Sequence, residues 1–127
     1  MALPCDRVTP RRARRFVAAL VEGRAHAADI ELLTSELVTN AIVHARTPAH
    51  LCVALTEPMV RVEVCDGSPD VATPRAADEW GGRGLRLVER LSDRWGVDAR
   101  RGGRRRGKSV WFEIDGGASH ASCANGR

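Results

Sequence analysis

Three polar side chains in the stretch 27–45 have the residue types and the spacing that metal binding or proton transfer would need. Glu36, Asn40 and His44 follow one another at intervals of four residues, so on a helix they lie in one stripe. A carboxylate and a carboxamide one turn apart suit oxygen ligation of Mg²⁺, directly or through water, and the carboxylate can also take a proton from a hydroxyl group. The alternative is a solvated polar face that is in phase by coincidence.

A second candidate is Asp66, which ends an apolar run and precedes the turn residues Gly67, Ser68 and Pro69. Its carboxylate could accept a hydrogen bond from an amino group of a ligand. Equally, it could bond to its own backbone, as aspartates in turns commonly do. Taken alone, Asp66 leaves both alternatives open.

A third candidate is the glycine-rich stretch 81–84, which leads into a helical pattern. Glycines let backbone N–H groups come close to phosphates, and the start of a helix favours anions. Arg83 could supply a charged donor. A flexible linker would have a similar composition, but the stretch ends a long loop, 67–84, and loops of that length within a compact domain are usually either functional or disordered.

Three helices must position these residues. We expect the first to run from a Thr9 cap and Pro10 to a stop at Gly23, the second over 27–45 and the third over 85–96. The apolar residues expected to face the core are Phe16, Val17, Leu20 and Val21 in the first helix, Ile30, Leu33, Leu37 and Ala41 in the second, and Leu85, Val88 and Leu91 in the third.

Two strand pairs complete the predicted elements. The runs 51–56 and 60–66 flank a short turn and predict a hairpin, and 95–98 with 108–114 predict a closing pair around an arginine- and glycine-rich loop. This order of elements predicts an α+β fold, a two-layer α/β sandwich with a mixed, mostly antiparallel sheet covered by about three helices. We expect one domain over 8–115 and a flexible tail over 116–127.

Composition excludes several classes of protein. The net charge of +4 comes from six basic residues between positions 100 and 108, and without these six charges it is −2. A nucleic-acid binder would need a broad basic face with aromatic residues for stacking, whereas tyrosine is absent and aromatic residues make up 4%. No apolar run reaches the roughly 20 residues of a membrane span, and the first residues have no apolar signal core. We therefore expect a cytoplasmic protein.

The four cysteines, Cys5, Cys52, Cys65 and Cys123, do not form the close pairs that are typical of structural zinc sites. Cys52 and Cys65 lie within apolar runs, where a reduced cysteine behaves as a small hydrophobic residue. We therefore expect free thiols, buried at these two positions, and no metal bound by cysteine.

In combination, the candidate motifs resemble the GHKL ATP-binding superfamily and, within it, the anti-sigma-factor serine/threonine kinases. Residues 36–45 are similar to the N-box of that family, 66–69 to its first glycine box and 82–85 to its second. The resemblance extends over about 8–115 in the order of the family. It implies a Bergerat-type ATP-binding fold, with ATP and Mg²⁺ as ligands.

The resemblance also implies roles for individual residues. Asn40 would ligate Mg²⁺, Glu36 would be the catalytic base that takes the proton of a substrate serine, and Asp66 would accept the adenine amino group. The other nucleotide-binding positions would be His44, Gly67, Gly82, Arg83, Gly84, Leu85 and, on the last strand, either Ser109 or Lys108. The sequence departs from the family pattern at Ser68 and Asp70, where the first glycine box usually has glycines.

The family resemblance implies a kinase that phosphorylates a serine or threonine of a small antagonist protein and also sequesters a sigma factor, with no direct nucleic-acid or membrane partner and with a homodimer as an option. A sensor histidine kinase would need a further domain, for which 127 residues leave no room. One alternative is a non-catalytic, ATP-gated protein-binding module in which Glu36 is only structural. Another is an arginine-rich nucleic-acid binder, whose affinity would fall steeply with salt and ignore ATP.

Overall fold

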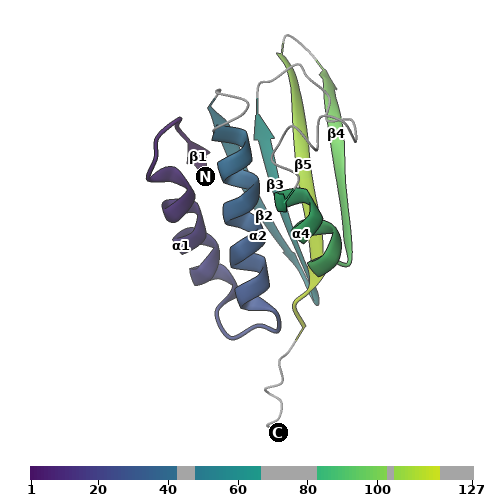
Figure 1. The fold of residues 1–127 in the computed structure, drawn as a ribbon. Coiled ribbons are helices and arrows are strands. Elements are labelled where there is room, and N and C mark those ends of the chain that lie inside the picture. The colour runs from purple at the N-terminus through teal and green to yellow at the C-terminus, as the bar shows by residue number, and fades with distance from the viewer. Residues whose placement is uncertain (43–47, 67–82, 103–104, 118–127) are drawn as a thin grey trace, which may run out of the picture.

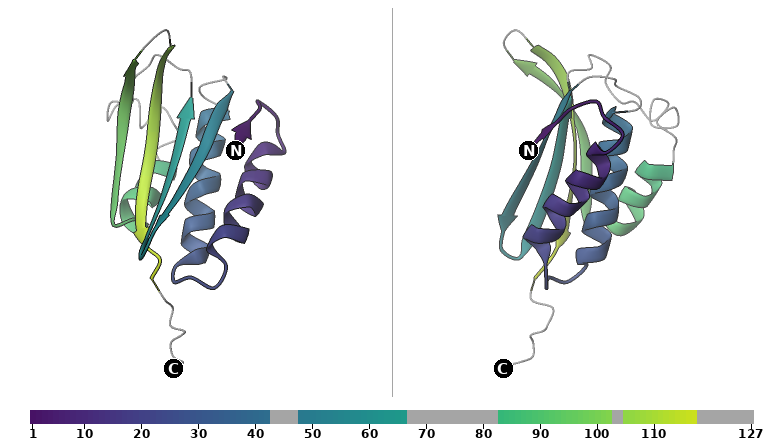
Figure 2. Two further views of the ribbon diagram at one scale, coloured as in Figure 1. Left: turned by 180° about the vertical axis from the view of Figure 1, so that it is seen from behind. Right: turned by 90° about the vertical axis from the view of Figure 1, so that its left-hand side faces the viewer.

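The structure is a computed structural model and describes residues 1–42, 48–66, 83–102 and 105–117. In this described part of the chain, three helices cover one face of a five-stranded antiparallel sheet, which makes two layers (Figures 1 and 2). The predicted α+β sandwich is therefore confirmed. In chain order the elements are β1 (Ala2–Leu3), α1 (Thr9–Val21), α2 (Ala27–Asn40), β2 (Ala49–Thr56), β3 (Met59–Asp66), α4 (Arg83–Leu91), β4 (Arg94–Gly102) and β5 (Arg105–Asp115).

The sheet has the strand order β1-β2-β3-β5-β4, and both predicted hairpins, β2–β3 and β4–β5, are present in it. The second hairpin is longer than predicted, because Arg100 lies opposite Gly107 and Gly102 opposite Arg105. The prediction of an arginine-rich loop was therefore wrong for most of its length. Strand pairing uses main-chain hydrogen bonds, which arginine allows, and charged residues are common on edge strands such as β4.

The N-terminal strand β1 was not predicted. Leu3 lies opposite Ala49 of β2, and its side chain is buried in the core. Two residues are too few to produce the alternation by which a strand is recognised in a sequence.

The hydrophobic core lies between the sheet and the helices. Alternate residues of the two central strands β3 and β5 are buried on the helix-covered face, and α2 presents Ile30, Leu33, Leu37 and Ala41 to it, as predicted. The buried strand residues are Val60, Val62 and Val64 on β3 and Val110, Phe112 and Ile114 on β5.

The prediction for the buried face of α1 was half wrong. Val17 and Val21 are buried together with Ala13, but Phe16 and Leu20 are 40% and 37% exposed. Residues at intervals of four share one stripe of a helix, and the stripe of Ala13, Val17 and Val21 is the one that faces α2 and the sheet. The neighbouring stripe, one residue behind, points outward.

The ends of the helices also differ from the prediction. The N-cap of α1 is Val8, not Thr9, whose hydroxyl donates a hydrogen bond to the Pro4 carbonyl oxygen at 2.8 Å. Helix α4 ends at Leu91 rather than at residue 96, because Arg94 already pairs with Glu113 of β5. Of the predicted second helix, residues 43–45 lie outside the described residues.

The prediction that Cys52 is buried was wrong. Cys52 lies opposite Glu63 on the face of the sheet that the helices leave open, and its side chain is exposed. Cys65 is buried as predicted, and Cys5 is exposed; all three are free thiols. Cys123 lies outside the described residues. Among the described helices, none is long and apolar enough to cross a membrane.

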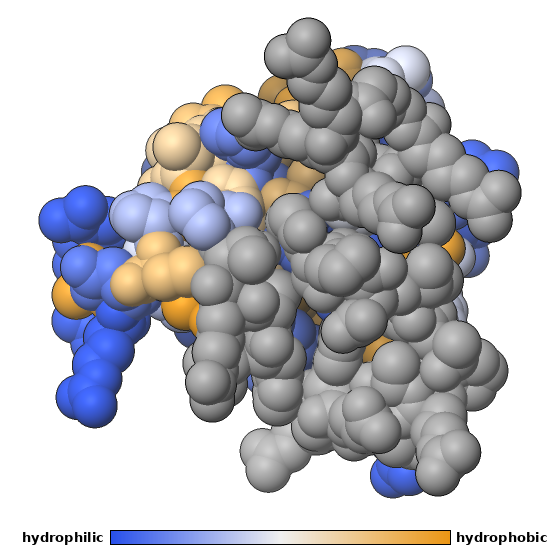
Figure 3. Space-filling model, turned by 90° about the horizontal axis from the view of Figure 1, so that it is seen from above, coloured by the Kyte–Doolittle hydropathy of each residue, from blue (hydrophilic) through white to orange (hydrophobic). Residues whose placement is uncertain are grey.

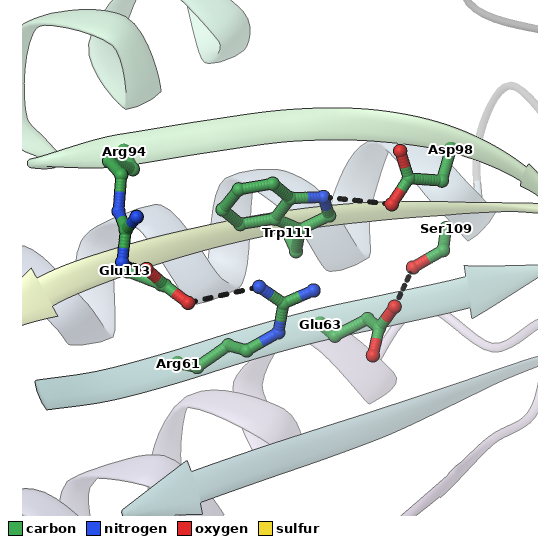
Figure 4. Close-up of polar contacts among 7 residues, drawn as sticks. All are labelled: Arg61, Glu63, Arg94, Asp98, Ser109, Trp111 and Glu113. Carbon is green, nitrogen blue, oxygen red and sulfur yellow. Dashed lines mark hydrogen bonds and ion pairs between the residues drawn. The ribbon is translucent and has the colours of Figure 1, made fainter. Parts of the chain in front are cut away.

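The open face of the sheet carries charged residues that pair with one another (Figure 4). The Arg61 guanidinium lies 4.2 Å from the centre of the Trp111 ring and 3.0 Å from the Glu113 carboxylate, which Arg94 also approaches, at 2.7 Å. The Trp111 indole N–H donates to Asp98 at 3.1 Å. This face is therefore a mutually paired polar surface over the core strands.

An ion pair connects the helix layer to the β2–β3 turn at the opposite end of the molecule from the start of α1. Arg24, between α1 and α2, donates two hydrogen bonds to the Glu57 carboxylate. These hydrogen bonds lower the pKa of Glu57 and raise that of Arg24.

Candidate functional site

Elements that are far apart in the sequence meet toward one end of the molecule. Helix α2 and strand β3 finish at this end and strand β5 starts there, and helix α4 begins below it with its first turn facing this end (Figure 1). Figure 3 looks onto this end from above. Most of the hydrophobic surface visible in this view lies on the left, which is the side of α1 in Figure 1. Of the candidate residues that the structure describes, Asn40, Asp66, Arg83, Gly84 and Lys108 lie at or near these element ends.

Asn40 is the last residue of α2 and is buried, with 7% of its surface exposed. Its side-chain nitrogen Nδ2 is fully buried and has no hydrogen-bond partner within the described part of the chain. A buried amide without a partner is costly, so its surroundings suit a polar ligand.

Glu36 lies one turn before Asn40 on the same helix and is half-buried. The two side chains therefore share the predicted stripe at the border of the core, between the buried seam and the solvent. The third predicted member, His44, lies outside the described residues.

Asp66 is the last residue of β3 and is also 7% exposed. It continues the alternation of Val62 and Val64, so it lies on the helix-covered side of the sheet. Its Oδ2 atom is 3.8 Å from the Nζ atom of Lys108, directly opposite on β5. A buried carboxylate at this position can accept a hydrogen bond from an amino group, as predicted from the first glycine box.

The structure distinguishes the two alternatives for the last strand. Ser109 donates a hydrogen bond to Glu63 on the open face of the sheet, away from Asp66 (Figure 4). Lys108 instead lies beside Asp66 on the helix-covered side. This geometry favours Lys108 over Ser109 as the residue that faces a ligand. The alternation of Val110, Phe112 and Ile114 was the signal that could have placed Lys108 correctly from the sequence.

The first turn of α4 contains Arg83, Gly84 and Leu85 of the second glycine box. The first N–H groups of a helix have no partner within it and, with the helix dipole, they attract anions. Leu85 is buried in the core and so anchors this turn against α2. Gly67 and Gly82 lie outside the described residues.

The chemistry of these donors and acceptors is of the kind that a nucleotide and its cation need. Within the described residues, no three His, Cys, Asp or Glu side chains come together as a metal site. A cation at this end would therefore take the Asn40 side-chain oxygen as its protein ligand and obtain others from phosphates and water, a common arrangement for Mg²⁺. The donors of the α4 start and the acceptor Asp66 can hold the two ends of such a ligand.

Comparison with known proteins agrees with this geometry. Residues 4–114 match the family described as "Histidine kinase-like ATPase domain". Among solved structures, the fold is similar to the histidine kinase domain of the blue-light activated histidine kinase from Erythrobacter litoralis EL346, with a TM-score of 0.53 and 21% identity. The similarity covers 94% of this chain but 65% of that one, so the chain spans less than two thirds of its structural relative. A comparison with curated protein sequences gave no match.

Proposed function

Because the chain belongs to the family of histidine kinase-like ATPase domains, we propose that it binds Mg-ATP at the shared end of α2, β3, α4 and β5 and acts as a serine/threonine protein kinase. Its substrate is a small antagonist protein, and the chain also sequesters a sigma factor, as in the anti-sigma-factor kinases that the motifs resemble. The observation that carries the proposal is the buried Asn40 amide nitrogen, which has no hydrogen-bond partner in the described part of the chain, with Glu36 one turn away.

Different residues bind different parts of Mg-ATP. Asp66 accepts the amino group of adenine, and the first turn of α4 binds the phosphates through its backbone N–H groups. The Asn40 oxygen ligates Mg²⁺, which neutralises phosphate charge when bound. The unpartnered Asn40 nitrogen is then free to donate to a phosphate oxygen.

The transfer step needs a base near the accepting hydroxyl group. The substrate hydroxyl oxygen attacks the γ-phosphorus, the bond from that phosphorus to the bridging oxygen breaks, and ADP leaves. Glu36 takes the hydroxyl proton, for which its half-buried place beside Asn40 is suited. Positioning and charge neutralisation supply the rest of the acceleration.

The test is transfer of radiolabelled phosphate from Mg-ATP to a small protein that co-purifies with the chain. We expect Glu36→Gln to retain ATP binding and to lose transfer by about 10²- to 10⁴-fold, the usual contribution of a general base. The matched control is Glu31→Gln on the same helix, because Glu31 pairs with Arg14 at 3.6 Å and has no part in the site. This control should transfer phosphate like the wild type.

Two other results would change the conclusion. If the wild type binds ATP tightly but never transfers phosphate, the chain is a nucleotide-gated binding module and Glu36 is structural. If calorimetry with Mg-ATP gives no heat of binding, the proposal fails as a whole.

A further inference from the structure

A buried ion pair lies within the candidate nucleotide site. Lys108 Nζ is 3.8 Å from Asp66 Oδ2, and the side chains are only 3% and 2% exposed. The two residues lie directly opposite each other at the ends of two central strands. Directly opposed residues of antiparallel strands have their side chains on the same face, so both charges lie on the helix-covered side.

Stability alone does not explain this pair. Removing two charges from water is expensive, and replacing a buried ion pair by apolar residues of similar size is often neutral or stabilising. The neighbouring positions on the same face, Val64 and Val110, are apolar and buried. A charged pair at the next position, where the strands meet the candidate site, therefore suggests a role in binding.

We propose that Lys108 and Asp66 together recognise the edge of the adenine base, with Lys108 as the donor of the pair. This inference rests on the proposed function, which assigns Asp66 to the 6-amino group. Adenine has a ring nitrogen acceptor, N1, directly beside that amino donor. The Lys108 ammonium, on a flexible four-carbon stem next to the carboxylate, donates a hydrogen bond to N1.

The same pair explains selection against guanine. A guanine in this orientation would place its 6-carbonyl oxygen against the Asp66 carboxylate and its protonated N1 against the Lys108 ammonium. In the first contact two hydrogen-bond acceptors would face each other, and in the second contact two donors would face each other. A site built to hydrogen-bond one pattern of donors and acceptors strongly rejects its reverse, because buried polar groups are left unpaired.

The test measures affinities of the wild type and of Lys108→Met for three nucleotides by calorimetry. These are ATP, 1-deaza-ATP, which lacks the N1 acceptor, and purine riboside triphosphate, which lacks the 6-amino group. We expect the wild type to bind 1-deaza-ATP at least about tenfold more weakly than ATP, as for the loss of a hydrogen bond to a charged group. Lys108→Met should bind ATP more weakly and no longer distinguish it from 1-deaza-ATP.

The difference in affinity between ATP and purine riboside triphosphate provides an internal comparison, because it reports on the contact of the 6-amino group. It should persist in Lys108→Met and disappear in Asp66→Leu, because leucine has no oxygen to accept a hydrogen bond from the amino group. The charge control is Arg12→Met, on the exposed side of α1, which should leave all three affinities unchanged. Thermal unfolding of each variant shows whether it is folded, and the comparison of nucleotides in the wild type does not depend on any variant.

The outcomes separate this inference from the proposed function. If the wild type binds ATP and 1-deaza-ATP equally, Lys108 does not contact N1, while ATP binding itself stands. If Lys108→Met weakens both nucleotides but keeps the tenfold difference, Lys108 only positions Asp66 and the inference is overturned. If the wild type binds no nucleotide, both proposals fail.

Discussion

Asn40 is buried, and its amide nitrogen has no hydrogen-bond partner among the residues that the structure describes. Asn40→Leu is therefore expected to keep stability or to raise it by up to about 2 kcal/mol, because an unsatisfied buried donor is removed. The same change should abolish Mg-dependent binding of ATP. Urea unfolding and calorimetry measure the two effects.

The matched control for this change is Thr34→Val on the same helix. Thr34 is fully buried, but its hydroxyl donates to the Ile30 carbonyl oxygen at 2.7 Å, so its polar group is satisfied. This variant should bind Mg-ATP normally. Strong destabilisation by Asn40→Leu would show that the amide serves the fold rather than a ligand.

The sequence motifs predict which residue types belong to the candidate site, but not which way their side chains point. Asn40 and Asp66 were predicted as site residues from the motifs, and they are buried as the last residues of α2 and β3, while their roles stay predictions. The choice between Lys108 and Ser109 stayed open because the motif gives residue types without orientation. The alternation of Val110, Phe112 and Ile114 along β5 puts Lys108 on their face, and the pairing of β5 with β3 shows that this position lies beside Asp66.

At the scale of elements, the β4–β5 hairpin has a close contact that requires glycine. Gly96 lies opposite Trp111, and a Cβ atom added there would be 2.7 Å from the Trp111 ring. We expect Gly96→Val to lower the free energy of unfolding by about 1–3 kcal/mol, as is typical of overpacking, measured by urea unfolding. In a Trp111→Thr background the same change should cost much less. An equal cost in both backgrounds would show that the ring is not the obstacle.

The three described helices and the strands of both hairpins were predictable in number and order, whereas the short strand β1 was missed and the ends and faces of the elements were less predictable. In α1, two adjacent stripes are apolar, and periodicity cannot decide which of them faces the partner layer. At α4, the helical pattern continues beyond Leu91, yet pairing with β5 begins at Arg94. Tertiary contacts therefore determine both which face of α1 is buried and where α4 ends.

At the scale of the whole molecule, the Arg24–Glu57 ion pair connects the two layers. Because the pKa of Glu57 is lowered on folding, its contribution to stability is present above the unfolded value, near 4.5, and is lost as the pH falls through the lower folded value. We expect the destabilisation caused by Glu57→Gln to be largest at neutral pH and to fade in acid. Urea unfolding across this range measures it.

The control for this prediction is the same substitution in an Arg24→Met background, where the pH-dependent part should vanish. Persistence of the pH dependence without Arg24 would assign it to another partner of Glu57.

The place where the candidate site residues come together was the least predictable feature at this scale. Residues from Glu36 to Lys108 contribute to one end of the molecule because α2 and β3 finish where β5 begins. No local pattern contains this information, since it depends on the strand order β1-β2-β3-β5-β4. The family motifs supplied it indirectly.

Because the proposed site is built from the ends of four elements, ligand binding there is coupled to folding. A chain that has lost any one of the four elements lacks part of the proposed site, so a ligand bound there is held by the native state alone. A ligand present at a hundred times its dissociation constant then adds about 2.7 kcal/mol to the free energy of unfolding. Resistance to proteolysis would accordingly rise and fall with nucleotide supply.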